Sequence, residues 1–179
     1  MRRALFLDRD GTLNVEVHYL NRPEDLVLID GAAEAIAEAR RRGWAAVVIT
    51  NQAGVGRGYF TAETLERIHA RLTDELARHH VTLDGIYACI HHPDAGCSCR
   101  KPEPGMILSA AADLDIDPRQ SWMIGDRASD LEAGRRAGCR TALVLTGYGA
   151  TTAAEGCHAD VVAPDLAAAV RCILEWEAA

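Results

Sequence analysis

Two aspartates separated by a single residue, Asp8 and Asp10, are the first side chains in the sequence that could do chemistry. They follow a short apolar run at residues 4–7, and Gly11, where the chain can turn, comes directly after them. Neighbouring carboxylates need a compensating cation, and Mg²⁺ suits hard oxygen ligands and bridges to phosphate. A polar turn after an edge strand would use the same residues, so the pair alone leaves both interpretations open.

Donors that could bind an anion stand at two later positions. Thr50 and Asn51 end a second apolar run, and Arg100 and Lys101 precede a predicted helix. Lys101 is the only lysine in the chain, and its compact charge fits beside a small anion where a guanidinium does not. A capping threonine and a solvated charge pair are the ordinary alternatives.

A third carboxylate follows a later apolar run, in the segment GDRASD at residues 125–130. Asp126 stands at the tip of the predicted strand, from which it could reach the acids that follow the first strand. Asp130 could instead interact with the positive end of the helix that begins there. We therefore predict that Asp126 is a metal ligand and that Asp130 is mainly structural, with support of the metal ligands as its alternative role.

Three of the six cysteines cluster beside a histidine and could hold a metal ion. The set consists of Cys89, His91, Cys97 and Cys99. Three thiolates and one imidazole form a closed tetrahedral set for structural Zn²⁺, which would fix the loop at about 89–103 and hold Lys101 in place. His92 is an alternative ligand, and a redox pair or free thiols are alternative functions.

Alternating strands and helices would bring these groups together. Apolar runs predict strands at 4–8, 44–50, 85–90, 122–125, 141–145 and 160–162. Helical patterns predict helices at 32–42, 61–80, 104–114, 129–137 and 166–176. Asp30 is a candidate cap for the first helix, and Ser129 with Glu132 is a candidate capping box. Such units imply an α/β fold with a three-layer, doubly wound, mostly parallel sheet, which binds ligands at the carboxyl ends of its strands.

The composition sets limits on the class of protein. A length of 179 residues predicts one domain, residues 1–179. The net charge of −7 disfavours sequence-independent binding to nucleic acid. No apolar run is long enough for a membrane helix, and residues 4–7 are too short for a signal-peptide core. We therefore predict a cytoplasmic protein that has neither nucleic acid nor membrane as a partner. Separately, we expect a monomer with a small molecule as its partner.

Taken together, the motifs resemble those of the haloacid dehalogenase (HAD) superfamily of aspartyl-phosphate phosphotransferases. The matching segments, in chain order, are DRDGT (8–12), Thr50-Asn51, Lys101 and GDRASD (125–130). No large insertion separates them, as in the members without a cap. The resemblance implies that Asp8 is the nucleophile and Asp10 the general acid and base. Thr50 and Lys101 would stabilise the transferring phosphoryl group, and Mg²⁺ would be held by Asp8, Asp126 and the Asp10 carbonyl.

The cysteine loop narrows the resemblance to two groups of phosphatases within this superfamily. Cys-x-His followed by Cys-x-Cys-Arg-Lys-Pro resembles the D-glycero-D-manno-heptose 1,7-bisphosphate phosphatases and the phosphatase domain of histidinol-phosphate phosphatases. The segments DRDGTLN (8–14) and TNQAGVGRGYF (50–60) resemble the heptose enzymes, whereas a short zinc loop also occurs in the histidinol-phosphate relatives. The substrate-binding residues implied are Glu16, Val17, His18, Tyr19, Asn51, Gln52, Arg57, Arg100 and Arg127.

The implied activity is Mg²⁺-dependent hydrolysis of the C7 phosphate of heptose 1,7-bisphosphate, in nucleotide-activated heptose biosynthesis. A histidinol-phosphate phosphatase is the alternative within the same class, but a bisphosphate needs more cations, which Arg57 and Arg100 supply. A receiver-like signalling domain also uses carboxylates, Thr, Lys and Mg²⁺; here Asp10 is available to hydrolyse the phosphorylated aspartate. A zinc-stabilised binding module with an inactive site is a third class.

Overall fold

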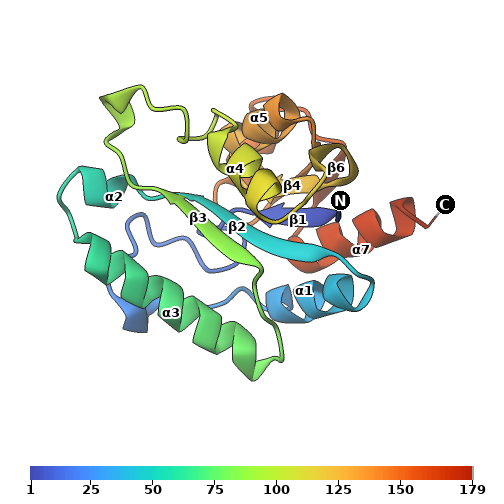
Figure 1. The fold of residues 1–179 in the computed structure, drawn as a ribbon, viewed down its shortest axis with the longest axis horizontal. Helices are drawn as coiled ribbons and strands as arrows, with labels where there is room; N and C mark the ends of the chain where they lie inside the picture. The colour runs from blue at the N-terminus through green and yellow to red at the C-terminus, as the bar shows by residue number, and fades with distance from the viewer. Residues whose placement is uncertain (179) are drawn as a thin grey trace.

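A six-stranded parallel sheet forms the centre of the computed structural model, which describes residues 1–178 (Figure 1). The strand order is β3-β2-β1-β4-β5-β6. The strands are β1 (Ala4–Leu7), β2 (Ala45–Asn51), β3 (Gly85–Cys89), β4 (Trp122–Gly125), β5 (Arg140–Val144) and β6 (Val161–Ala163). The order reverses between β1 and β4, and such a switch point is where doubly wound sheets bind ligands.

Helices cover both faces of this sheet and give it three layers. The helices are α1 (Ala32–Arg41), α2 (Ala53–Gly56), α3 (Ala62–Arg78), α4 (Gly105–Asp113), α5 (Ala128–Ala137), α6 (Gly149–Ala154) and α7 (Leu166–Trp176). Three short 3₁₀ helices are η1 (Pro23–Asp25), η2 (Pro93–Ala95) and η3 (Pro118–Gln120). Helices α1, α3 and α7 pack on one face and α4 and α5 on the other.

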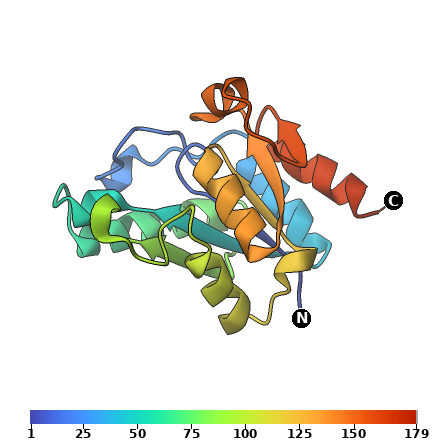
Figure 2. The same cartoon turned by 90° about the horizontal axis from the view of Figure 1, so that it is seen from above.

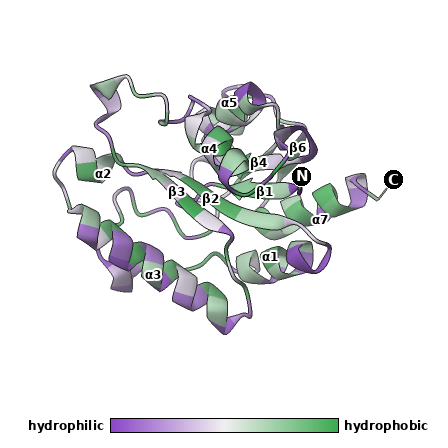
Figure 3. Ribbon diagram, viewed as in Figure 1, coloured by the Kyte–Doolittle hydropathy of each residue, from purple (hydrophilic) through white to green (hydrophobic). Residues whose placement is uncertain are grey.

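Alternating side chains of β1 supply both halves of the core. Leu5 and Leu7 belong to the cluster under α1, α3 and α7, whereas Ala4 and Phe6 belong to the cluster under α4 and α5. All four are fully buried, as is typical of a central parallel strand with helices on both sides. Helix α3 is half polar, and its alternation of hydrophobic and hydrophilic residues is visible in Figure 3.

The two long loops lie at the carboxyl end of the sheet, as Figures 1 and 2 show. Residues 8–31 connect β1 to α1, and residues 90–104 connect β3 to α4. Within residues 1–178 these segments hold short 3₁₀ helices and isolated β-bridges but no α-helix or longer strand, so no large cap covers the strand ends. Among residues 1–178, no helix combines the length and the apolar character needed to cross a membrane.

All six predicted strands are present, with ends that differ by at most one residue, but two predicted caps are wrong. Gly31, with a left-handed φ of 78°, caps α1 in place of Asp30. Helix α5 begins after Arg127, whose backbone N–H donates to Asp130 Oδ2 at 2.9 Å. Ser129 therefore lies inside the helix and forms no capping box. The short helices α2 and α6 were not predicted, because one turn shows no periodicity.

Candidate active site

Three buried aspartates meet at the switch point between β1 and β4. One carboxylate oxygen from each of Asp8, Asp126 and Asp130 lies within 4.8 Å of the other two. Gly11, with a φ of 83°, turns the chain beside them, and a side chain there would collide with the Asp126 carboxylate. Asp126 Oδ2 accepts a hydrogen bond from Tyr148 N at 2.7 Å, whereas the buried Oδ1 has no partner. Hard oxygen donors with a free position fit Mg²⁺.

Burial and mutual repulsion raise the pKa values of two of these carboxylates. Burial raises the pKa of Asp126 to about 6, and the negative charge of Asp130 adds to the effect. Burial also raises the pKa of Asp8 well above its ordinary value, with a further contribution from Asp130, although the charge of Lys101 opposes both. A cation in the cluster would favour the ionised form of each carboxylate.

Lys101 reaches this cluster from the loop between β3 and α4. Its Nζ lies 2.7 Å from Asp8 Oδ1 and 2.7 Å from Asp130 Oδ1, and it donates to the Ile49 carbonyl at 2.8 Å. Burial alone would lower the pKa of Lys101, but the charges of Asp130 and Asp8 raise it. Asn51 fixes the backbone, since its side-chain amide donates to Lys101 O at 3.0 Å and accepts from Lys101 N at 3.1 Å. Asp130 thus also holds Lys101, a contact that its place in the sequence did not indicate.

Asp10 is held beside the cluster by three donors. Arg9, which is fully buried, donates to Oδ2 at 2.8 Å, and Asn14 donates to Oδ1 at 3.0 Å. Gln52 Nε2 lies 2.9 Å from Asp10 Oδ2 and 2.8 Å from Thr50 Oγ1, so it connects two expected catalytic side chains. Burial raises the pKa of Asp10, but the charge of Arg9 and these hydrogen bonds outweigh it and lower the pKa. Sequence reasoning missed Arg9 and Asn14, although both lie within four residues of Asp10, the side chain to which they donate.

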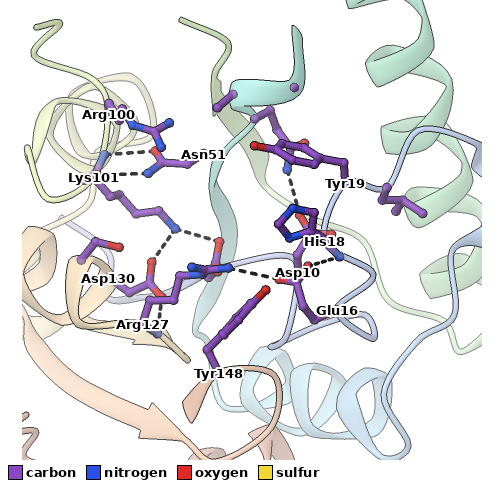
Figure 4. Close-up of a pocket in the computed structure, with 16 residues that line it drawn as sticks. Asp10, Glu16, His18, Tyr19, Asn51, Arg100, Lys101, Arg127, Asp130 and Tyr148 are labelled. Atoms are coloured by element: carbon purple, nitrogen blue, oxygen red, sulfur yellow. Dashed lines mark hydrogen bonds and ion pairs between the residues drawn. The ribbon is translucent and has the colours of Figure 1, made fainter. Parts of the chain in front are cut away.

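A cavity of about 370 Å³ opens above these residues. The expected substrate-binding residues that line it are Glu16, His18, Tyr19, Asn51, Gln52, Arg100 and Arg127 (Figure 4). Thr50 and Asp126 are buried and do not line the cavity. The structure also leaves Val17 and Arg57 outside: Val17 is 45% exposed, and Arg57 lies on the exposed end of α2. The expectation that these two contact the substrate is not supported by their positions.

Tyr148 is a lining residue that sequence reasoning missed. It follows β5, at the same edge of the sheet as the other site residues. Its ring centroid lies 3.8 Å from Arg127 Cζ, and Arg127 Nη2 lies 3.6 Å from Glu16 Oε2. The signal available in the sequence was its place just beyond a strand end, because parallel strands share that edge.

The expected zinc ligands converge at the end of β3. Cys89 Sγ lies 3.1 Å from Cys99 Sγ and 3.6 Å from Cys97 Sγ, and His91 Nδ1 lies 3.2 Å from Cys99 Sγ. Ligands at 2.3 Å from a tetrahedral zinc lie about 3.8 Å apart, so the cluster is compatible with a zinc site after small adjustments. Burial and hydrogen bonds from the other thiols raise the pKa of Cys99 to about 12, so a metal-free cluster would be only partly ionised.

Comparisons with known proteins agree with this geometry. The HAD-hydrolase-like family model matches residues 98–169. The D-glycero-β-D-manno-heptose-1,7-bisphosphate 7-phosphatase of Pasteurella multocida (strain Pm70) is 42% identical over 154 residues, which are 82% of this chain and 84% of the relative. The Escherichia coli (strain K12) protein of the same name is 44% identical over 160 residues, 85% of this chain and 84% of the relative.

A solved structure is similar over almost the whole chain. The D,D-heptose 1,7-bisphosphate phosphatase from B. bronchiseptica, complexed with magnesium and phosphate, superposes with a TM-score of 0.92 at 37% identity. The match covers 98% of this chain and 99% of that one.

Proposed function

Because this chain belongs to the heptose bisphosphate phosphatase family of HAD-like hydrolases, we propose that it hydrolyses the C7 phosphate of D-glycero-β-D-manno-heptose 1,7-bisphosphate. The observation that carries the proposal is the Asp8 carboxylate, which lies at a cavity that also presents Lys101, Arg100 and Arg127. A carboxylate nucleophile beside several cations suits transfer of a phosphoryl group from an ester that bears a second phosphate. The β anomer is the one named in the curated relatives.

The proposed reaction proceeds in two steps at Asp8. A carboxylate oxygen of Asp8 attacks phosphorus in line, and the bond to the C7 oxygen breaks. The negative charge of a bound phosphate opposes the effect of Arg9 and favours protonation of Asp10. The protonated Asp10 gives its proton to the departing sugar oxygen, and then takes a proton from the water that attacks the aspartyl-phosphate. Thr50 and Lys101 donate to the phosphoryl oxygens, where negative charge is distributed during transfer. The net products are inorganic phosphate and the heptose 1-phosphate.

The residues that would hold Mg²⁺ are Asp8, Asp126 and the Asp10 carbonyl. The unpartnered Asp126 Oδ1 and the close approach of the carboxylates support this assignment. When bound, the ion supplies positive charge that reduces the repulsion between the nucleophile and the phosphate. Asp130 already bonds with Lys101 and the Arg127 backbone, so its proposed role is to position these two residues.

Structural zinc at Cys89, His91, Cys97 and Cys99 would fix the loop that carries Arg100 and Lys101. Nη1 of Arg100 is buried without a partner, which supports a role in binding a second anion. We also propose that the protein acts in the cytoplasm as a monomer, and that neither nucleic acid nor membrane is its partner. The net charge of −7 supports only the absence of sequence-independent binding to nucleic acid.

Phosphate release in the presence of Mg²⁺ tests the proposed function. Both anomers of heptose 1,7-bisphosphate are compared with histidinol phosphate at equal concentration. A large preference in kcat/KM for the β-heptose would support the proposal. A preference for histidinol phosphate would leave the chemistry intact and overturn the substrate. A phosphorylated Asp8 that persists without turnover would favour the signalling alternative.

A further inference from the structure

The side chains of Arg127 and Tyr148 meet on one wall of the cavity. Arg127 Cζ lies 3.8 Å from the centroid of the Tyr148 ring, and Figure 4 shows the ring alongside the arginine. The two residues precede α5 and α6, so the loops after the neighbouring strands β4 and β5 bring them together. An arginine over an aromatic face is attracted by the ring and stacks with its planar guanidinium.

Glu16 completes the surroundings of the Arg127 guanidinium. Its Oε2 lies 3.6 Å from Arg127 Nη2, and its side chain is 15% exposed, against 48% for Arg127. A half-exposed arginine has many accessible rotamers and loses that freedom when it binds a ligand. Here the contacts with the ring and with the carboxylate restrict the guanidinium before any ligand arrives.

The backbone of Tyr148 is attached to the carboxylate cluster independently of its ring. The Tyr148 N–H donates to Asp126 Oδ2 at 2.7 Å, and the hydroxyl of Thr152 donates to Asp126 O at 2.8 Å. The Thr146 hydroxyl donates to Gly11 O at 2.6 Å. These contacts hold the segment firmly, so the ring is a fixed support for Arg127. A substitution of the ring also retains the backbone N–H, which separates the two roles experimentally.

We propose that Tyr148 is a positioning residue that holds the Arg127 guanidinium ready for the second, non-reacting phosphate of the substrate. This inference rests on the proposed function, which supplies a substrate with two phosphates. The reacting phosphate belongs beside Asp8, so the other phosphate needs its own cation elsewhere in the cavity. Arg127 also compensates the charge of Glu16, which would otherwise repel that phosphate. Ordering the guanidinium in advance reduces the entropy lost on binding.

The test compares two substrates that differ only in the second phosphate, heptose 1,7-bisphosphate and heptose 7-phosphate. The readout is the ratio of kcat/KM for the first to kcat/KM for the second. We expect Tyr148→Leu to lower this ratio about tenfold through a higher KM for the bisphosphate. This is the size of effect expected when the cation of Arg127 loses its contact with an aromatic ring. Tyr148→Phe keeps the ring and should restore the wild-type ratio. Thr151→Ala, an exposed position on α6 outside the cavity, serves as the matched control.

A second background distinguishes positioning of Arg127 from other roles of the ring. In an Arg127→Leu enzyme, Tyr148→Leu should cause no additional fall in the ratio. An unchanged ratio in Tyr148→Leu, or a full effect that persists without Arg127, overturns the inference while the proposed function stands. If the wild-type enzyme shows no preference for the β-heptose over histidinol phosphate, the proposed function fails and this inference fails with it.

Discussion

The Lys101 ammonium nitrogen lies 2.7 Å from Oδ1 of Asp8, and both side chains are almost completely buried. The cation therefore neutralises the nucleophile in the structure as it stands. Once a phosphate occupies the cavity, the same ammonium group is close enough to donate to it. One lysine would then serve two states of the site, because its charge is compact and has three donors.

Replacement of Lys101 should abolish most of the turnover. Lys101→Met leaves Asp8 and Asp130 without their shared cation, so we expect kcat to fall by about 10²–10³-fold, as for loss of one preorganised donor. Lys101→Arg should not restore it, because the buried position fits only a compact charge. Steady-state kinetics at saturating Mg²⁺ measures both variants, with Arg171→Met on the exposed side of α7 as the control. Near-normal kcat in Lys101→Arg would contradict the argument from size.

Asp126 should make the Mg²⁺-free protein less stable as the pH rises. The pKa of Asp126 is raised from 3.8 to about 6 by burial and by Asp130. The folded state therefore binds more protons than the unfolded chain between about pH 4 and pH 6, and stability declines with rising pH across that interval. The change in pKa corresponds to about 3 kcal/mol. Urea unfolding of Asp126→Asn should show a growing advantage over the wild type from pH 4 to pH 7.

Addition of Mg²⁺ provides the control for this titration. The ion favours the ionised carboxylate, so it should stabilise the wild type at pH 7 more than Asp126→Asn. Protein dialysed without a chelator keeps any zinc and limits the comparison to the carboxylate site. A difference between wild type and variant that does not change with pH would mean that Asp126 is ionised throughout.

The main features of the site were predictable because parallel strands end at one edge. Asp8 and Asp126 come from strands far apart in sequence, yet each follows an apolar run, and the fold brings their carboxylates within 4.8 Å. The four zinc-type ligands were predictable for a more local reason, since their spacing within one loop limits how far apart they can lie. Both patterns depend on short-range sequence and on the architecture of the sheet.

The remaining features depend on contacts between loops, which no local pattern encodes. The pair between Asp130 and Lys101 joins α5 to the loop before α4, and the stack of Tyr148 on Arg127 joins two separate loops. Arg57 is a predicted substrate contact that the structure leaves outside the cavity. Its neighbours in sequence resemble a substrate loop, but the single turn of α2 places it on the exposed side.

Asp10→Asn should separate the two chemical steps. An aryl phosphate has a good leaving group, so its attack by Asp8 needs little help from an acid, whereas hydrolysis of the aspartyl-phosphate needs a base. We expect about one equivalent of phenolate in a rapid phase, followed by turnover slowed by about 10²–10⁴-fold. Mass spectrometry of the quenched protein should show the added mass of one HPO₃ group. Unchanged turnover would mean that Asp10 is not the acid and base.

Removal of one thiol should release the metal and destabilise the loop. Wild-type protein purified without a chelator should contain one zinc per chain by elemental analysis, and Cys97→Ser should contain less. Structural zinc contributes to folding, so the free energy of unfolding of Cys97→Ser should be lower than that of the wild type. A decrease of about 3 kcal/mol would lower its Tm by about 6–12 °C. Cys172→Ser, an exposed cysteine outside the cluster, should change neither zinc content nor Tm. Absence of zinc from the wild type would contradict the proposed site.

Arg100 and Arg57 should differ in their effect on KM, although the sequence suggested the same role for both. Arg100 lines the cavity and has a buried, unpartnered Nη1, whereas Arg57 is exposed and outside it. Hydrogen bonds to charged groups contribute about 1.5–3 kcal/mol, so Arg100→Ala should raise KM for the bisphosphate by about 10- to 100-fold. Arg57→Ala should leave KM close to the wild-type value. An equal rise in both variants would mean that residues 53–60 approach the substrate in the bound enzyme.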